Sequence, residues 1–391
     1  MRALPFVFAL TMTIGLAWPT AVRAQLECTG EVCSTIPISS AEYNGLFTEL
    51  QTQYTRPLLE RMAEALGIAN LTTPQIGAVN LNDAWTIGAN VGGGSTSLEA
   101  VDIQATGIGS IEDVPVAGGA INARLFAGVN LGVLTGHRYS PYGSPDSNGE
   151  GDDGDAKSAS AKSPAWYSPA RFDLYFSGLK HTERMQDEYG VSGQLRITTR
   201  TESFEVRYHL LDGKDLVAGA MLRFRGVSLG AGYAWTAQRL RYFSNETDTL
   251  SLSLAEGVNL DWIGQNYAIL ENNVRSNFAE LRTGLQLIYF LNLTLAAGYA
   301  QSKGQVDFFA TRFGPVVLSS DPLAQLAGSG ITLPDTDAAL SFRLYERGDV
   351  PVALYYGKLG LEFQILMLRL GVEGILTENS YGASLGVRFE F

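Results

Sequence analysis

The chain has 391 residues, a formal net charge of −12, a charged fraction of only 17% and 43 glycines. The negative net charge argues against nucleic acid as a partner. Beyond residue 24 no stretch of ~18 uncharged apolar residues occurs, so no spanning helix is predicted, and only a closed barrel of strands could cross a membrane.

The first 24 residues have the pattern of a secretory signal peptide. Arg2 supplies a positive charge, an apolar run extends from Leu4 to Trp18, and Val22 and Ala24 are small residues at the expected cleavage positions. A membrane anchor is the alternative, but the run is short and ends at a proline. We therefore expect cleavage between Ala24 and Gln25 and export of the mature chain.

The two cysteines, Cys28 and Cys33, follow this site closely. Close spacing in an exported protein predicts a disulfide between them. The ring is small and removes little chain entropy, so the disulfide should staple the amino terminus rather than hold the fold.

Residues 25–80 are predicted to form a helical segment. Apolar residues at helical spacing run from Leu46 to Tyr54, and a second run from Leu58 to Leu66 follows Pro57 and precedes Gly67. Proline suits a first helical turn, and glycine often follows a helix end. Such a helix could rest on the inner end of a barrel, plug it, or lie in the periplasm.

From about residue 81 the apolar period changes from 3.6 to two, which predicts strands to the end of the chain. Hairpins at 221–235, 284–299 and 360–373 repeat one plan, with small and charged residues on one face and Leu, Val and aromatics on the other. In the strand at 190–210 the apolar parity slips between Thr199 and Phe204, which a β-bulge or a missed hairpin would explain. The predicted strands, about twelve within a range of ten to fourteen, are 83–93, 98–106, 119–136, 169–181, 190–210, 215–225, 227–243, 276–290, 293–308, 353–364, 367–377 and 381–391.

The last strand carries Leu385, Val387, Phe389 and Phe391 on its apolar face and ends on an aromatic residue. It resembles the terminal strand of Gram-negative outer-membrane β-barrels. The resemblance covers residues 81–391 and implies an all-β, antiparallel up-and-down barrel in outer-membrane lipid, inserted by the barrel-insertion machinery through this strand. An even strand number would return both termini to the periplasmic side and place the long connections 137–168, 244–275 and 309–352 outside.

The helical segment before the barrel also resembles, faintly, the long-chain fatty-acid transporter family. That family's Asn-Pro-Ala plug motif is absent here, so neither a substrate nor a binding residue is carried over. The helical segment is a candidate plug.

Charged residues on the polar parity of the strands are the candidates for the barrel lumen. They can form a selectivity lining, or they can pair across strands and merely fill a narrow barrel. These residues are Arg124, Arg171, Asp173, Arg223, Arg225, Arg282, Lys358, Glu362, Arg369, Glu373, Arg388 and Glu390.

The acidic loop at 146–155 resembles half of a calcium-binding loop. Asp146, Asn148 and Glu150 take the first ligand positions and Asp152 follows, but Lys157 stands where a bidentate Glu is required. A solvated, flexible loop is therefore the better interpretation, and neither a metal nor a cofactor is predicted.

The three histidines, His137, His181 and His209, raise the question of a barrel enzyme. No G-x-S-x-G or H-E-x-x-H motif accompanies them, so an enzyme is the least favoured function. The favoured one is a passive, porin-like pore or transporter for small solutes. The alternative is a non-transporting surface protein whose long loops bind a partner.

Overall fold

The computed structural model describes residues 25–29, 48–49, 51–72, 79, 81, 84–96, 99–105, 109–135, 166–186, 193–217, 221–244, 247–255, 258–319 and 338–391. The signal peptide with Ala24, the cysteine Cys33 and the acidic loop at 146–155 lie outside these ranges. Cleavage, the disulfide and the weak calcium site therefore stay predictions.

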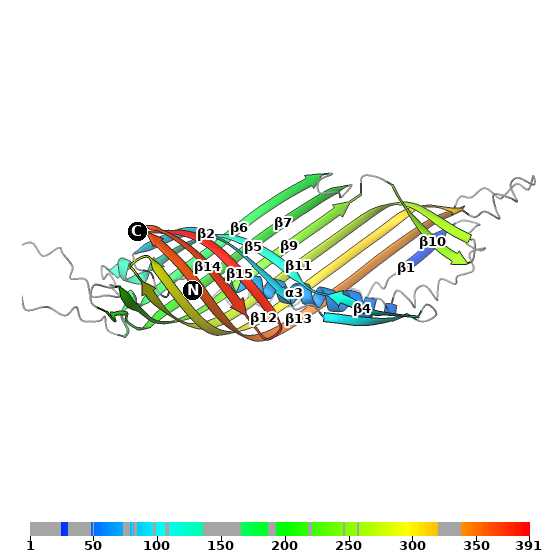
Figure 1. Ribbon diagram of the computed structural model, residues 1–391. Coiled ribbons are helices and arrows are strands. Elements are labelled where there is room, and N and C mark those ends of the chain that lie inside the picture. The colour runs from blue at the N-terminus through cyan, green and yellow to red at the C-terminus, as the bar shows by residue number, and fades with distance from the viewer. Residues whose placement is uncertain are drawn as a thin grey trace, which may run out of the picture.

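Ten antiparallel strands form a closed ring (Figure 1). The ring closes where β15 pairs with β2, with Glu390 opposite Thr86. The predicted all-β, up-and-down barrel with a short helical segment is confirmed, and ten strands are the lower end of the predicted range. In ring order the strands are β2 (Trp85–Thr96), β5 (Gly119–Asn130), β6 (Phe172–Gln186), β7 (Gln194–Leu211), β9 (Leu222–Phe243), β11 (Val258–Leu287), β12 (Leu291–Ser319), β13 (Ala338–Ile365), β14 (Leu368–Leu376) and β15 (Ser380–Glu390).

The strand register defines the tilt of the ring. Following the paired residues once around all ten strands from Phe363 leads back to Pro351 on the same strand, a displacement of twelve residues. At ~3.3 Å per residue and ~4.8 Å between strands, this displacement implies a tilt of ~40° and a radius of ~10 Å. The tilt is that of membrane barrels, and the interior has room for one helix if its neighbours are small.

Two predicted strands are absent from the ring. The strands predicted at 215–225 and 227–243 are one strand, β9, because Gly226 forms a β-bulge with φ +89° instead of a turn. Beyond the bulge, the inward and outward positions of the strand exchange. In the sequence this change looks like the turn between two strands. The strand predicted at 98–106 is β3 (Glu99–Ala105), which pairs with β4 (Gly109–Val116) in a separate hairpin.

The remaining elements are short and lie around the ring. The strand β1 (Gln25–Thr29) pairs with β13, β8 (Lys214–Asp215) with β9, and β10 (Asp248–Ala255) with β11. A π-helical turn, η2 (Gln51–Thr55), leads into the helix α3 (Arg56–Asn70), and two 3-10 turns, η3 (Leu131–Thr135) and η4 (Pro169–Arg171), flank the β5–β6 connection. No helix in the described ranges is long and apolar enough to cross a membrane.

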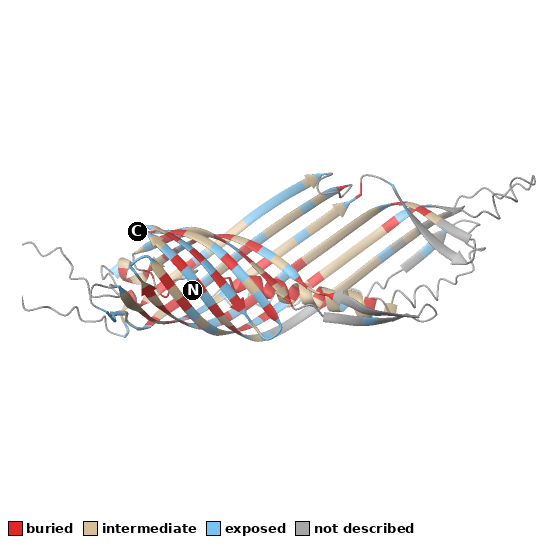
Figure 2. Ribbon diagram, in the orientation of Figure 1, coloured by how far each residue is buried: buried red, intermediate tan, exposed pale blue. Residues whose placement is uncertain are grey.

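An apolar belt surrounds the ring, and buried and exposed residues alternate along its strands (Figure 2). Tyr355 and Phe363, eight residues apart on β13, belong to an upper and a lower aromatic row. Eight residues span ~27 Å along the strand and ~20 Å of height at this tilt, close to the thickness of an outer-membrane apolar band. The upper aromatic row consists of Phe176, Phe204, Tyr233, Tyr299, Tyr355 and Tyr381.

Six strands continue beyond the upper aromatic row as an open trough, here called the extension (Figure 1). Within it the two faces exchange polarity: on β12, Leu295 and Tyr299 face outward below the boundary, whereas Lys303 faces outward and Val306 is buried inside above it. The parity slip predicted between Thr199 and Phe204 is this exchange of polarity. It is not a β-bulge, because the register of β7 with β9 runs unbroken through these residues. The extension comprises residues 179–186, 194–203, 234–243, 258–276, 300–319 and 338–354.

The amino-terminal segment enters the ring from the extension side. β1 pairs with Ala339–Arg343 at the far end of β13, α3 descends into the lumen, and Trp85 begins β2 beside Phe391 at the other rim. The strand β1 and the carboxyl terminus therefore lie at opposite ends of the ring (Figure 1). The chain threads the barrel before its first ring strand, and the prediction that both termini are periplasmic stays a prediction.

The placement of the long connections also needs correction. The connection between β5 and β6, which contains the predicted loop 137–168, leaves and re-enters the ring at the rim of Phe391, since Asn130 pairs with Asp173 there. Residues 244–275 and 309–352, predicted as loops, are largely strands of the extension.

Candidate functional site

The helix α3 occupies the upper lumen of the barrel. Leu66, Ile68 and Ala69 are fully buried against apolar side chains of the wall and of the extension, such as Phe278 and Val306. Pro57 lies in the first turn, where proline is compatible with a helix, and no other proline occurs between Arg56 and Asn70. The helix continues three residues past Gly67, the predicted end, to Asn70.

Glycines in the wall make room for this helix. A Cβ on Gly94 would lie 2.2 Å from the Ala65 carbonyl oxygen, and one on Gly382 would lie 2.8 Å from a methyl group of Ile68. A Cβ on Gly92 would meet Thr72 at 2.4 Å. The ring is thus shaped around the helix, and α3 is a fitted plug.

Wall residues bind the carboxyl end of the plug. Arg124 donates to the carbonyls of Thr72, at 2.8 Å, and Asn70, and Asn122 donates to the Ala69 carbonyl at 2.7 Å. Lys358 donates to the Leu71 carbonyl at 2.7 Å. The last carbonyls of a helix are its negative end, so the two cations both satisfy them and stabilise the helix dipole.

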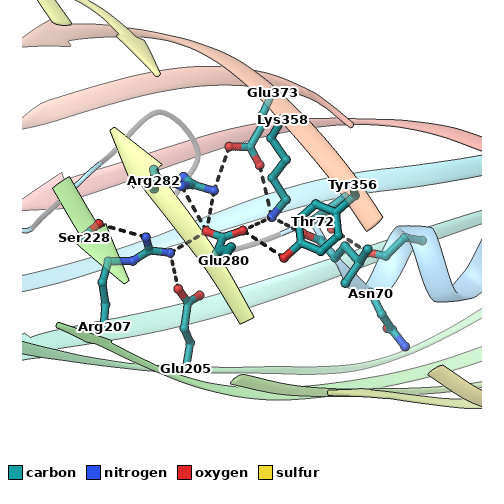
Figure 3. Close-up of polar contacts among 12 residues, drawn as sticks. Asn70, Thr72, Glu205, Arg207, Ser228, Glu280, Arg282, Tyr356, Lys358 and Glu373 are labelled. Atoms are coloured by element: carbon teal, nitrogen blue, oxygen red, sulfur yellow. Dashed lines mark hydrogen bonds and ion pairs between the residues drawn. The ribbon is translucent and has the colours of Figure 1, made fainter. Parts of the chain in front are cut away.

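Directly below the plug, six charged side chains form a buried network (Figure 3). At its centre the Glu280 carboxylate lies 2.6 Å from Arg207, 3.1 Å from Arg282 and 2.8 Å from Lys358. Glu205 pairs with Arg207, and Glu373 lies 3.0 Å from Arg282. Three anions thus face three cations, and the network carries no net charge.

A second balanced group lies near the rim of Phe391. Arg369 contacts Glu390 at 2.7 Å and Glu362 at 3.3 Å, while Arg388 contacts Glu362 at 2.6 Å and Glu390 at 3.2 Å. All four side chains are at most 3% exposed. In both groups, oppositely charged side chains therefore pair with each other across strands and are buried.

His209 belongs to a third buried group. Its Nε2 lies 2.8 Å from an Asp173 carboxylate oxygen, and Asp173 also accepts bonds from Asn130 and from the backbone N–H of Leu81. His209 and Asp173 are at most 1% exposed. The pair holds the threading segment against the wall, and its burial gives no access to a substrate.

The candidate lumen residues, with two exceptions, lie buried on the ring strands. Arg171 is buried in the turn η4, 3.1 Å from Asp212. Arg223 lies at the rim of Phe391, partly exposed, with its Nε 2.5 Å from Asp215. The buried residues are Arg124, Arg171, Asp173, Arg225, Arg282, Lys358, Glu362, Arg369, Glu373, Arg388 and Glu390.

Several residues of the network were missed in the sequence. Glu205 and Arg207 lie on β7 just below the parity slip, which hid their inward direction. Glu280, two residues before Arg282, shares its parity and could have been found by that spacing. Asn70 could not, because only the position of the helix explains its contact with Arg124. Tyr356 donates to Glu280 and shares the parity of Lys358 on β13.

A cleft of about 800 Å³ lies beside the plug, at the level of the upper aromatic row. It exists because β5 separates from β6 above the pair Leu125–Gly178, while β6 and β7 stay paired to Gln186. Above this point the outer face of β15, β2 and β5 opposes the inner face of β6, β7, β9 and β11. The main apolar lining residues are Met62, Ile121, Leu179, Ile197, Leu240, Leu270 and Tyr381.

Two side chains bridge the separated strands. Thr201 on β7 donates to the Ala123 carbonyl at 2.9 Å, and Gln238 on β9 donates to the Ile121 carbonyl at 2.6 Å. These bonds satisfy edge groups of β5 that β6 would otherwise pair. His181 and Glu183 are the titratable residues at the cleft. No cluster of ligands that could hold a metal occurs among the described residues.

A closed antiparallel ring with an apolar outer belt and a polar, ion-paired interior defines the class as a membrane-spanning type of β-barrel, plugged by a helix. The chain belongs to the Lsa36-like family, whose model matches residues 21–391. A comparison with curated proteins finds no match.

Three solved structures are among those to which the chain is similar. A FadL homologue from Pseudomonas aeruginosa is 10% identical, with a TM-score of 0.26 over 83% of this chain and 98% of that chain. The toluene transporter TbuX from Ralstonia pickettii is 8% identical, with a TM-score of 0.23 over 83% and 93%. The outer membrane protease OmpT from Escherichia coli is 8% identical, with a TM-score of 0.34 over 82% and 99%.

Proposed function

We propose that the protein is an outer-membrane transporter that binds small apolar molecules in the cleft between β5 and β6, with α3 as its gate. The observation that carries the proposal is the cleft itself. Its volume of about 800 Å³ lies within the ~300–1,000 Å³ of ligand pockets, and its lining is mainly apolar.

The position of the cleft favours a lateral route. One wall is the outer face of β15, β2 and β5, the same face that carries the lipid-facing Leu385 and Val91 lower down. The other wall is the apolar inner face of the extension, with Ile197 and Leu240. An apolar molecule dissolved at the membrane boundary therefore meets an apolar surface that leads inside the extension.

The cleft also touches the gate. Met62 of α3 lines it, and Asn122, which holds the Ala69 carbonyl, lies on its β5 wall. A ligand in the cleft therefore contacts both the plug and one of the residues that hold it. In this closed arrangement the paired charges and the helix fill the lumen, so the proposal is a gated transporter and not an open porin. The short turns at Phe391 would face the periplasm, as in other membrane barrels.

Binding in lipid nanodiscs tests the proposal, with tritium-labelled hexadecane as the probe and empty nanodiscs subtracted. Ile197→Glu places a charge in the cleft, whereas Thr198→Glu places one on the outer face of the same strand. We expect saturable binding by the wild type and by Thr198→Glu, and binding weakened at least ~tenfold by Ile197→Glu. The substitution removes the apolar contact of Ile197 and adds a second carboxylate beside its cross-strand neighbour Glu183. Absence of saturable binding, or equal binding by both variants, would contradict the proposal.

A further inference from the structure

Three arginines form a row across the outer face of the extension. Arg184 on β6 pairs directly with Arg196 on β7, and Arg196 pairs with Arg241 on β9. All three point outward, since the inward positions of these strands carry residues such as Leu195, Ile197 and Leu240. Directly opposed residues of an antiparallel pair lie ~4.5–5.5 Å apart, and like charges at these positions repel.

The row lacks partners among the described residues. Neighbouring cations are neutralised: Arg200 pairs with Glu202 at 2.5 Å, and Arg239 pairs with Glu271 at 2.5 Å. No described carboxylate forms an ion pair with Arg184, Arg196, Arg241 or the nearby Lys180. These four residues, here called the basic face, contrast with the balanced charges of the lumen and with the net charge of −12.

The basic face also contains a hollow. Arg196, Thr198, Arg239 and Arg241 line a shallow cavity of about 210 Å³, and the Nε atom of Arg241 is buried without a hydrogen-bond acceptor. Guanidinium groups bind phosphate and carboxylate through two parallel hydrogen bonds, so the arrangement fits an oxyanion held between adjacent strands.

The height of the basic face above the membrane selects the kind of anion. Lys180 lies four residues beyond Phe176, and Arg184 lies eight residues beyond it on the same strand. At ~3.3 Å per residue and the ~40° tilt, these cations stand ~10 Å and ~20 Å above the aromatic row. Phospholipid headgroups reach only ~5–8 Å beyond the hydrocarbon. The matching ligand has anionic groups carried further out, on a sugar headgroup.

We infer that the basic face binds the phosphate and carboxylate groups of an anionic glycolipid in the outer leaflet beside β6, β7 and β9. Binding neutralises the Arg184–Arg196–Arg241 row and anchors the extension over the membrane. The site is separate from the cleft, on the opposite face of the same strands.

A binding experiment in zwitterionic detergent micelles tests this site. The probe is a rough-type lipopolysaccharide, and its binding is measured by native mass spectrometry for the wild type, for Arg196→Gln/Arg241→Gln and for Lys214→Gln/Arg223→Gln. The last variant is the control: it also loses two positive charges, but at the opposite rim of the ring. We expect at least tenfold weaker binding by the Arg196/Arg241 variant only. Equal binding by all three proteins would overturn the inference.

Two competitors distinguish the source of the anion. Phosphatidylglycerol carries its charge near the hydrocarbon, so we expect it to bind the wild type and the Arg196/Arg241 variant with equal affinity. Inorganic phosphate at millimolar concentration should not displace the lipopolysaccharide. Complete displacement by phosphate would overturn the glycolipid assignment in favour of a free-anion site, and equal discrimination by phosphatidylglycerol would overturn the argument from height.

Discussion

The ammonium group of Lys358 donates to the carbonyl of Leu71 at 2.7 Å and at the same time lies 2.8 Å from the carboxylate of Glu280. One side chain thus joins the carboxyl end of the plug helix to the ion network that fills the lower lumen. The plug helix is held through the ion network. A substitution that breaks the network should therefore also loosen the helix, and a substitution that displaces the helix should weaken the network.

Replacing Lys358 by Met should lower the free energy of unfolding by ~3–5 kcal/mol, because the three buried carboxylates of the network would then face only two cations, Arg207 and Arg282. Urea unfolding in detergent measures this change. The matched control is Lys303→Met on the outer face of the extension, where the side chain is exposed and the expected change is within ~0.5 kcal/mol. Equal effects of the two substitutions would show that Lys358 is not a structural link.

The boundary between membrane and extension lies at Tyr299 on β12. Leu295→Arg, on the lipid-facing side below it, should destabilise the barrel in lipid by ~2–4 kcal/mol, whereas Gln301→Arg, on the same face above it, should change stability by less than ~1 kcal/mol. Equilibrium unfolding in liposomes checks both. A large loss of stability for Gln301→Arg would place the membrane boundary above residue 301 and would contradict the exchange of polarity between the two faces.

The threading of the amino terminus predicts a difference in accessibility between two sites. Thr29 is exposed in β1, beside the far end of β13, and Leu366 lies in the β13–β14 turn at the rim of Phe391. In a chain without its native cysteines, a maleimide that cannot cross the outer membrane should label Thr29→Cys in intact cells. It should not label Leu366→Cys. Labelling of Leu366→Cys alone would reverse the orientation.

Much of the ring could be predicted from the sequence, because strands with one apolar and one polar face show an apolar period of two. The hairpins β11–β12 and β13–β14 were found in this way, and so was the terminal strand, although the first turn lies at residues 288–290 and not between the predicted strands 276–290 and 293–308. The strand count was two too high because the bulge at Gly226 and the hairpin of β3 and β4 imitate ring strands locally.

The candidate site was only partly predictable. Inward charges such as Glu362 follow from parity, but whether they line an open pore or fill a closed one depends on long-range pairing. The cleft was not predictable, because it arises where β5 leaves β6 at Leu125, a global feature of the ring. The exchange of polarity between the faces was visible at Thr199–Phe204 and was interpreted as a local irregularity.

Planar-bilayer conductance of two glycine variants tests the gate most directly. A Cβ on Gly94 would lie 2.2 Å from the helix backbone, whereas one on Gly119, on β5 nearby, meets nothing within 4 Å. We expect the wild type and Gly119→Ala to be closed to ions and Gly94→Ala to conduct, because the plug can no longer seat. Equal conductance of all three proteins, whether open or closed, would contradict a lumen gated by α3.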